Sequence, residues 1–141
     1  MMLTLALACG SAALAEVPAP IAMNSSALGG AALNQYTPGV DQGKGPNNIG
    51  LLIRTWGKVT FIDPVNKFFY IDDGFGRLDG FGQVGVRVSY DNLATGESVT
   101  VPDLHGYYTI TGIISTVMID TKIQPNVRPR RDSDVVKVAQ L

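Results

Sequence analysis

Residues 51–74, LLIRTWGKVTFIDPVNKFFYIDDG, carry the clearest structural pattern of this chain. Apolar and polar residues alternate along both of its halves, which predicts two half-buried β-strands. Between the halves, DPVN at 63–66 has turn chemistry, because proline presets φ at about −65° and the flanking Asp and Asn bond their own backbone. A third strand is predicted over 83–90, QVGVRVSY, where three valines share one face. These three strands follow one another in meander order.

Further along the chain, the pattern predicts a fourth strand over 107–119 and a fifth over 134–139. Gly57 and Gly112 are expected to mark bends that let one long strand serve both halves of a small barrel. Residues 121–132 contain two prolines, which predicts extended or irregular chain at a sheet edge. The sequence therefore predicts an all-β fold, a small barrel of five strands.

The composition of the 141-residue chain fits one domain with a core, plus an extension. Its 16 glycines and 8 prolines favour short strands and tight turns over helices. The formal net charge is −1, so no global positive field is expected to recruit nucleic acid or an anionic membrane.

The first fifteen residues, MMLTLALACGSAALA, are small and apolar, and ALA at 13–15 has the shape of a signal-peptidase site. This segment is too short to span a bilayer, and we expect an export signal rather than a retained hydrophobic segment. Cys9 is the only cysteine, so no intrachain disulfide is possible. The expected location is extracellular or at the cell surface, with no stable membrane span.

Residues 16–48 form a separate arm before the barrel, which is expected to occupy 49–141. The arm is rich in Ala, Gly, Pro, Ser and Asn, and it buries too little apolar surface to fold alone. We therefore expect it to become ordered only against another surface. The apolar residues expected to make that contact are Val17, Ile21, Leu28, Leu33 and Tyr36.

Five motifs occur along residues 49–140: GLLIRTWGKVT, FFYIDDG, VGVRV, HGYYTITGI and VRPRRDSDVV. In this order they resemble a family of bacterial exported OB-fold (oligonucleotide/oligosaccharide-binding-like) domains, over about two thirds of the chain. The resemblance implies a five-stranded Greek-key OB-type barrel. Its motif residues are glycines at bends, alternating apolar positions and an Asp-Gly turn, so it implies no catalytic residue.

A ligand-binding face is predicted from the aromatic and basic residues of the first three strands. OB-folds bind single strands by stacking bases on aromatic side chains, while basic groups follow the backbone. The alternative is that the aromatic residues pack the barrel and the basic side chains extend over them. The candidate residues are Arg54, Trp56, Lys58, Phe68, Tyr70 and Arg87.

Asp72, Asp73 and Asp79 lie in a Gly-rich stretch, where they are weak candidates for Ca²⁺ ligands. The spacing lacks the regular ligand pattern of an EF-hand, so a plain turn is the better interpretation. His105 is the only histidine, and no nucleophile–base pair can be assigned around it. We expect no cofactor, no other metal site and no enzyme activity.

The basic cluster Arg128, Arg130 and Arg131 is followed closely by Asp132 and Asp134. One interpretation is that this cluster contacts an anionic ligand. Pairing of the arginines with those aspartates is the better interpretation.

Two functional hypotheses follow. In the first, the chain is a secreted structural subunit that self-assembles head-to-tail into an extracellular filament or surface layer, with its arm packing on a neighbouring barrel. In the second, it is an extracellular module that binds a glycan or single-stranded nucleic acid on the aromatic and basic face.

Overall fold

A computed structural model describes residues 18–80 and 82–138. The predicted export signal at 1–15, Val17 in the arm and the end of the predicted fifth strand lie outside these residues. Two short 3₁₀ helices, η1 (Ser25–Ala27) and η2 (Asp132–Asp134), accompany the strands. The strands are β1 (Ile21–Ala22), β2 (Leu52–Asp63), β3 (Phe68–Asp72), β4 (Val86–Ser89), β5 (Tyr107–Ile119), β6 (Lys122–Arg128) and β7 (Val135–Lys137). The predicted all-β class is confirmed.

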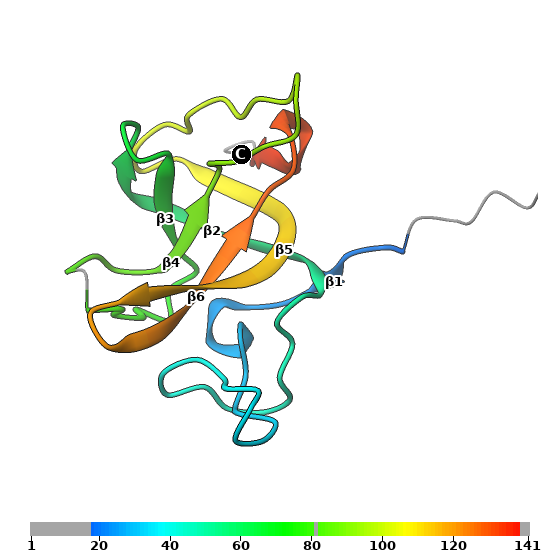
Figure 1. The fold of residues 1–141 in the computed structure, drawn as a ribbon. Helices are drawn as coiled ribbons and strands as arrows, with labels where there is room; N and C mark the ends of the chain where they lie inside the picture. The colour runs from blue at the N-terminus through cyan, green and yellow to red at the C-terminus, as the bar shows by residue number, and fades with distance from the viewer. Residues whose placement is uncertain (1–17, 81, 139–141) are drawn as a thin grey trace, which may run out of the picture.

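The strands form one mixed sheet in the order β1-β2-β3-β4-β6-β5-β7 (Figure 1). Because β2 also pairs with β5, the five strands β2, β3, β4, β6 and β5 close into a ring. Two pairings are parallel, β1 with β2 and β4 with β6, and the others are antiparallel. The predicted turn at 63–66 joins β2 to β3, where Asp63 Oδ1 accepts a hydrogen bond of 2.9 Å from the Asn66 amide.

The edge position predicted for residues 121–132 is wrong, because β6 lies inside the sheet between β4 and β5, while its chain is extended, one of the two alternatives predicted. Asp41 N donates to Ile123 O at 2.6 Å, so the Ile123 carbonyl points away from β5. Backbone groups alternate along a strand, and the nitrogen of Pro125 therefore points away from β5 as well. Pairing with β4 is confined to Asn126 and Val127, so the proline interrupts no ladder. The predicted fifth strand is β7, which extends the sheet from β5 and lies outside the ring.

Gly57 and Gly112 lie where the two long strands change partners. β2 pairs with β5 up to Lys58 and with β3 from there on, while β5 passes from β2 to β6 at Ile113. A Cβ atom on Gly57 would lie 2.8 Å from the backbone of Asp72. A Cβ on Gly112 would lie 2.6 Å from Arg128 O. Both distances are shorter than any side chain tolerates, so these positions require glycine.

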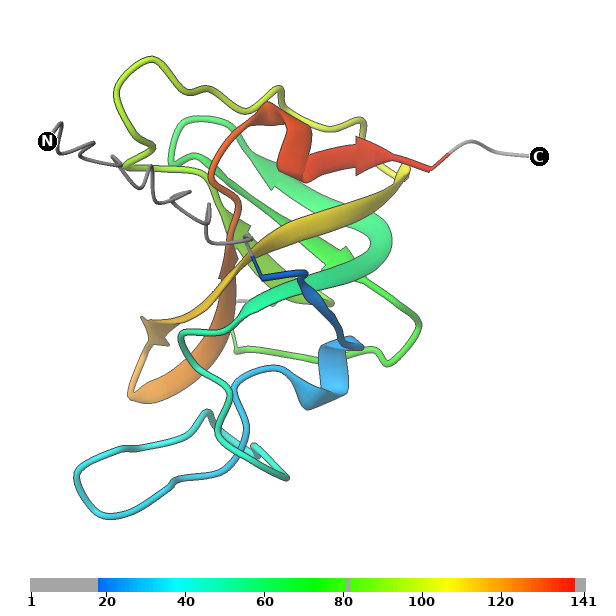
Figure 2. The ribbon, with the colours of Figure 1, turned by 90° about the vertical axis from the view of Figure 1, so that its right-hand side faces the viewer.

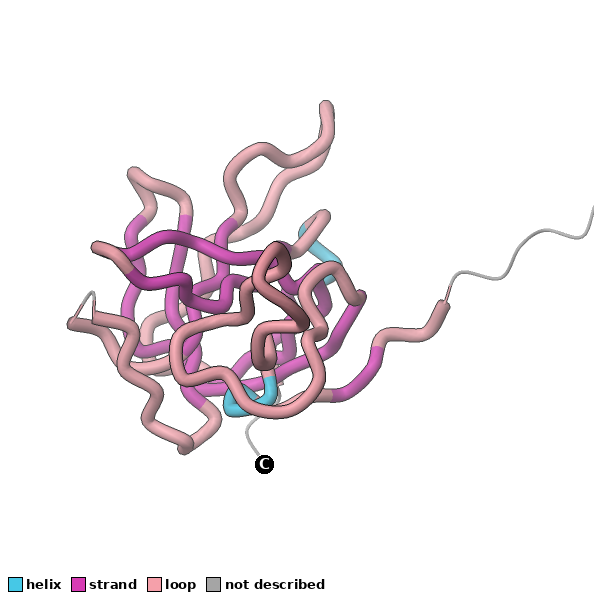
Figure 3. Tube along the Cα trace, turned by 60° about the horizontal axis from the view of Figure 1, so that its bottom comes forward, coloured by secondary structure: helices cyan, strands magenta, loops and turns pink. Residues whose placement is uncertain are grey.

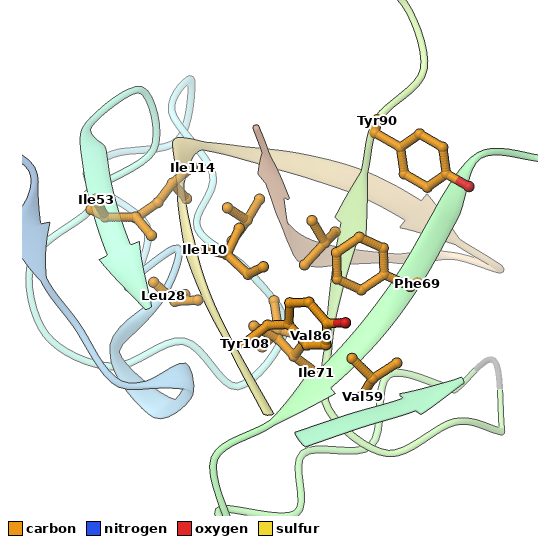
Figure 4. Packing of buried hydrophobic residues seen from close by; sticks show 12 residues of the cluster. Leu28, Ile53, Val59, Phe69, Ile71, Val86, Tyr90, Tyr108, Ile110 and Ile114 are labelled. Atoms are coloured by element: carbon orange, nitrogen blue, oxygen red, sulfur yellow. The ribbon is translucent and has the colours of Figure 1, made fainter. Parts of the chain in front are cut away.

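The core fills the interior of the ring, with side chains from every ring strand and from the arm (Figure 4). Leu28 of the arm is only 1% exposed and packs within this cluster. The cluster consists of Leu28, Ile53, Val59, Phe69, Ile71, Val86, Val88, Tyr90, Tyr108, Ile110, Ile114 and Val127.

The described part of the arm packs on its own barrel, beneath one end of it (Figures 1 and 2). β1 runs parallel to β2, with Ile21 opposite Ile53, and Met23 N donates to Arg54 O at 2.9 Å. Ser25 donates to Asp73 through its amide, at 2.8 Å, and also through its hydroxyl.

Most of the arm is loop, interrupted by η1 (Figure 3). Its loop is held by side-chain amides rather than by a core of its own. Asn48 accepts from Gly29 N and donates to Ala27 O, each at 2.7 Å. Of the residues predicted to contact another surface, Leu28 is buried, whereas Ile21, Leu33 and Tyr36 are exposed.

Replacing Leu28 with Ala should lower the free energy of unfolding by about 2–5 kcal/mol, because it removes a buried side chain from the core. Leu33, which lies in the same arm and is 72% exposed, is the matched control. Leu33→Ala should change the free energy of unfolding by less than about 0.5 kcal/mol. Urea unfolding of the two variants measures both values. Equal effects would contradict the packing of Leu28 into its own barrel.

Candidate functional site

A shallow cleft of about 340 Å³ lies on the outer face of β3, β4 and β6. The residues between its lining positions, such as Phe69, Val88 and Val127, point into the core, so strand alternation directs the lining side chains outward. The turn after β2 and the chain after β4 border it. The lining residues are Asp63, Asn66, Phe68, Arg87, Ser89, Asp91, Thr116, Val117, Asn126 and Arg128.

Arg87 is positioned by an aromatic ring on the neighbouring strand. Its guanidinium lies 3.5 Å from the centroid of Phe68, a cation–π contact that orients a charged group along the floor of the cleft. Phe68 is only 4% exposed and makes an edge contact with Tyr70, their ring centroids 6.0 Å apart. Arg87 is therefore held by packing before any ligand arrives.

A second set of polar groups crosses β4 and β6. Ser89 Oγ donates to Asn126 Oδ1 at 2.9 Å, and Asn126 Nδ2 donates to Ser115 Oγ at 3.2 Å. Arg128 Nη2 donates to Asp91 at 2.8 Å through the carboxylate and at 3.1 Å through the carbonyl. These contacts fix the side-chain amide and the guanidinium beside one another.

The cleft carries balanced charge. Asp63 and Asp91 contribute two negative charges and Arg87 and Arg128 two positive ones, so the formal sum is zero at neutral pH. Hydrogen bonds from the side chain and backbone of Asn66 hold the pKa of Asp63 below its usual range, and the charge of Arg87 adds to this effect. The cleft thus offers fixed donors and fixed acceptors without a net field.

The structure divides the six predicted ligand residues between two surfaces. Phe68 and Arg87 line the cleft. Arg54, Trp56 and Lys58 lie on the outer face of β2, in the part that pairs with β5, and do not line it. The side chain of Trp56 is 46% exposed there.

Tyr70, the sixth predicted ligand residue, is buried and donates its hydroxyl hydrogen bond to Asp79. Burial and this carboxylate raise the pKa of the Tyr70 phenol above its usual value. Tyr70 therefore packs beside Phe68 on the same face of β3 and is not available to a ligand.

Sequence reasoning missed Ser89, Asn126 and Arg128 as cleft residues. Alternation along β4 does place Ser89 on the face of Arg87, so that signal was present. Asn126 and Arg128 were missed because their segment was not predicted to be a strand.

The three weak Ca²⁺ candidates serve separate local hydrogen bonds. Asp72 Oδ1 accepts from Gly76 N at 2.9 Å, Asp73 accepts from Ser25, and Asp79 accepts from Tyr70. Within residues 18–80 and 82–138, no three His, Cys, Asp or Glu side chains are grouped so as to hold a metal ion.

The arginine cluster near the C-terminus is partly paired with its own aspartates. Arg130 donates to Asp134 through Nε at 2.9 Å and through Nη2 at 3.0 Å, as the sequence indicated. Arg128 pairs with Asp91 instead, which brings it into the cleft.

No protein-family model matches this chain, and no curated protein sequence matches it either. In the part of the chain that the structure describes, no helix has the length and apolar character needed to cross a membrane.

The carboxylate of Asp73 should make the attachment of the arm sensitive to acid. Burial acts to raise the pKa of Asp73, but the hydrogen bonds from Ser25 outweigh it and hold the pKa below its usual value. A carboxyl group with a depressed folded pKa stabilises the fold above its unfolded pKa, and this contribution is lost as the pH falls through the folded pKa.

We therefore expect wild-type protein to be more stable than Asp73→Asn at pH 7, with the difference shrinking below about pH 4. Urea unfolding of both proteins between pH 2 and pH 7 (roughly the range of carboxyl titration) measures this. A difference that stays constant across the range would rule out the role of the ionised carboxylate.

Proposed function

We propose that this chain is an exported, non-catalytic module that binds a neutral glycan in the cleft over β3, β4 and β6. The observation that carries the proposal is the charge-balanced set of fixed donors and acceptors in a cleft of about 340 Å³. Ligand clefts typically enclose about 300–1,000 Å³ and use a few well-placed polar groups for orientation. Sugar hydroxyls both donate and accept, and carboxylate, guanidinium and amide groups side by side match that requirement.

The strand order of the ring supports an OB-type barrel as the scaffold for this module. OB-folds bind oligonucleotides and oligosaccharides on the face of their second and third strands, beside the loop between the first and second. In the ring, β3 and β4 hold the second and third places. The turn that carries Asp63 and Asn66 joins the first ring strand to the second, and it borders the cleft.

Two observations favour a glycan over single-stranded nucleic acid. A strand with one phosphate per nucleotide is bound by an excess of positive charge, and the charges of the cleft cancel. Bases also need exposed aromatic faces to stack on, whereas Phe68 is almost fully buried beneath Arg87.

The proposal predicts that neutral oligosaccharides bind the full chain and that Arg128→Ala weakens the binding at least about tenfold. The expected loss corresponds to one hydrogen bond to a charged group, about 1.5–3 kcal/mol. Arg54→Ala, which removes a basic side chain from the outer face of β2, is the matched control and should bind normally. A glycan array followed by calorimetry on the strongest neutral oligosaccharide measures this.

Salt dependence separates the two ligand classes. Neutral-glycan affinity should change little with added salt, while binding of an oligothymidylate would fall steeply. If the chain binds oligothymidylate and either Arg54→Ala or Trp56→Ala abolishes that binding, the glycan proposal is wrong. The site would then be a nucleic-acid site on β2.

A second proposal is head-to-tail self-assembly through the arm, into a filament or surface layer. The supporting observation is that β1 joins β2 as an added strand, held by backbone hydrogen bonds that a neighbour's arm can form equally well. Such an exchange reuses the contacts already present within one chain. Because the arm and its acceptor lie at different places on the subunit, the exchange propagates a filament unless it closes into a ring.

Cross-linking tests this exchange. Ser25→Cys and Asp73→Cys are made in separate chains that carry Cys9→Ser, and the two are mixed, unfolded, refolded and treated with a short bismaleimide. Linked dimers, together with filaments of the full chain in electron micrographs, are expected if arms exchange. Unlinked monomers in both assays would assign the arm to its own barrel.

A further inference from the structure

A second and larger cavity lies between the arm, the loop after β3, and β6. The volume of this cavity is about 800 Å³, against about 340 Å³ for the cleft. The cavity lies apart from the cleft, and the two share no lining residue. The arm contributes Asp41 and Lys44, the loop contributes residues 75–78, and β6 contributes Gln124.

Arg77 brings a partly buried positive charge into the wall of this cavity. Its Nη2 donates to two uncharged oxygens, Asp41 O at 2.9 Å and Gln124 Oε1 at 3.4 Å. Its Nε is buried and has no hydrogen-bond partner. Among the residues that the structure describes, no carboxylate forms a salt bridge with this guanidinium.

The nearest acidic groups do not neutralise Arg77 directly. The Asp41 carboxylate is bonded to Lys122 Nζ at 3.0 Å, and Asp79 accepts from Tyr70. Both act on Arg77 only at longer range, and burial lowers its pKa despite them. A buried charge costs free energy unless a counter-charge accompanies it, so a bound anion would stabilise this guanidinium.

The rest of the cavity adds a second cation and an apolar rim. Lys44 is exposed on the arm side of the cavity. Phe75 and Leu78, on either side of Arg77 in the loop, are 60% and 69% exposed. Two large apolar side chains beside a guanidinium that has no salt bridge make this part of the surface both cationic and apolar.

We propose that this cavity binds a small amphipathic carboxylate. The carboxylate pairs with Arg77 and Lys44, as guanidinium and ammonium groups pair with carboxylates elsewhere. The apolar part of the ligand lies against Phe75 and Leu78. This site is independent of the proposed glycan cleft, and its ligand joins the arm to the barrel.

Octanoate is the probe, and calorimetry on the full chain is the measurement. Acetate has the charge without the apolar chain and octanol has the chain without the charge, so both should bind at least about tenfold more weakly than octanoate. Arg77→Lys should retain much of the affinity, and Arg77→Gln should lose at least about tenfold.

Lys44→Gln provides a variant with no structural contact to lose, because Lys44 is exposed and makes no hydrogen bond or salt bridge within the described residues. It should weaken octanoate binding several-fold, whereas Lys58→Gln on β2 should not. Arg128→Ala should leave octanoate binding unchanged, which separates this site from the cleft. Equal binding of octanoate and octanol, or wild-type affinity in both Arg77→Gln and Lys44→Gln, would overturn the proposal.

Discussion

The ring depends on two places where backbones touch without a side chain between them. At Gly57, β2 leaves β5 and turns to β3, and at Gly112, β5 leaves β2 and turns to β6. A Cβ atom would lie 2.8 Å and 2.6 Å, respectively, from neighbouring backbone, so any larger residue would push the strands apart. Without these changes of partner, β2 and β5 would continue as a flat pair and the ring would not close.

A register shift between Val59 and Phe61, where β2 passes to β3, gives β2 two separate outer surfaces. Before Gly57, the outward residues of β2 are Arg54 and Trp56, and they lie over the pairing with β5. Near the end of β2, the outward residue Asp63 lies opposite Phe68 and borders the cleft. The alternation along β2 therefore changes phase, and its outward residues do not form one continuous face. Arg54, Trp56 and Lys58 consequently lie on a different surface from Phe68 and Arg87.

The hairpin at 51–74 was predictable because alternation and turn chemistry agree there, and both are local properties. The segment 122–128 was not, because whether Pro125 breaks a ladder depends on which way its nitrogen points. The hydrogen bond from Asp41 to Ile123 shows that this nitrogen points away from β5, and β4 has no partner at that position; both are tertiary facts. Because this segment was not predicted to be a strand, Asn126 and Arg128 were not predicted to line the cleft.

The arm shows a different limit. Its composition predicted that it needs another surface, and Leu28 does pack into one, while Ile21 pairs with β2 through its backbone. Composition cannot say whose surface it is, because strand addition and the burial of one leucine have the same chemistry within a chain and between chains. Only the position of the docked arm distinguishes contact within a chain from contact between chains. In the structure the arm packs on its own barrel.

The docked position of the arm links the proposed carboxylate cavity to the proposed exchange of arms. A carboxylate between Lys44 of the arm and Arg77 of the loop binds only where both walls are present, so its binding free energy adds to the docking of the arm. Arm exchange rebuilds the same walls from two chains, and one ligand then occupies a cavity shared between subunits. The cavity therefore favours the docked arm over the open one in either arrangement. The ligand therefore does not decide between monomer and assembly. That choice depends on protein concentration, because only the exchange of arms brings two chains together.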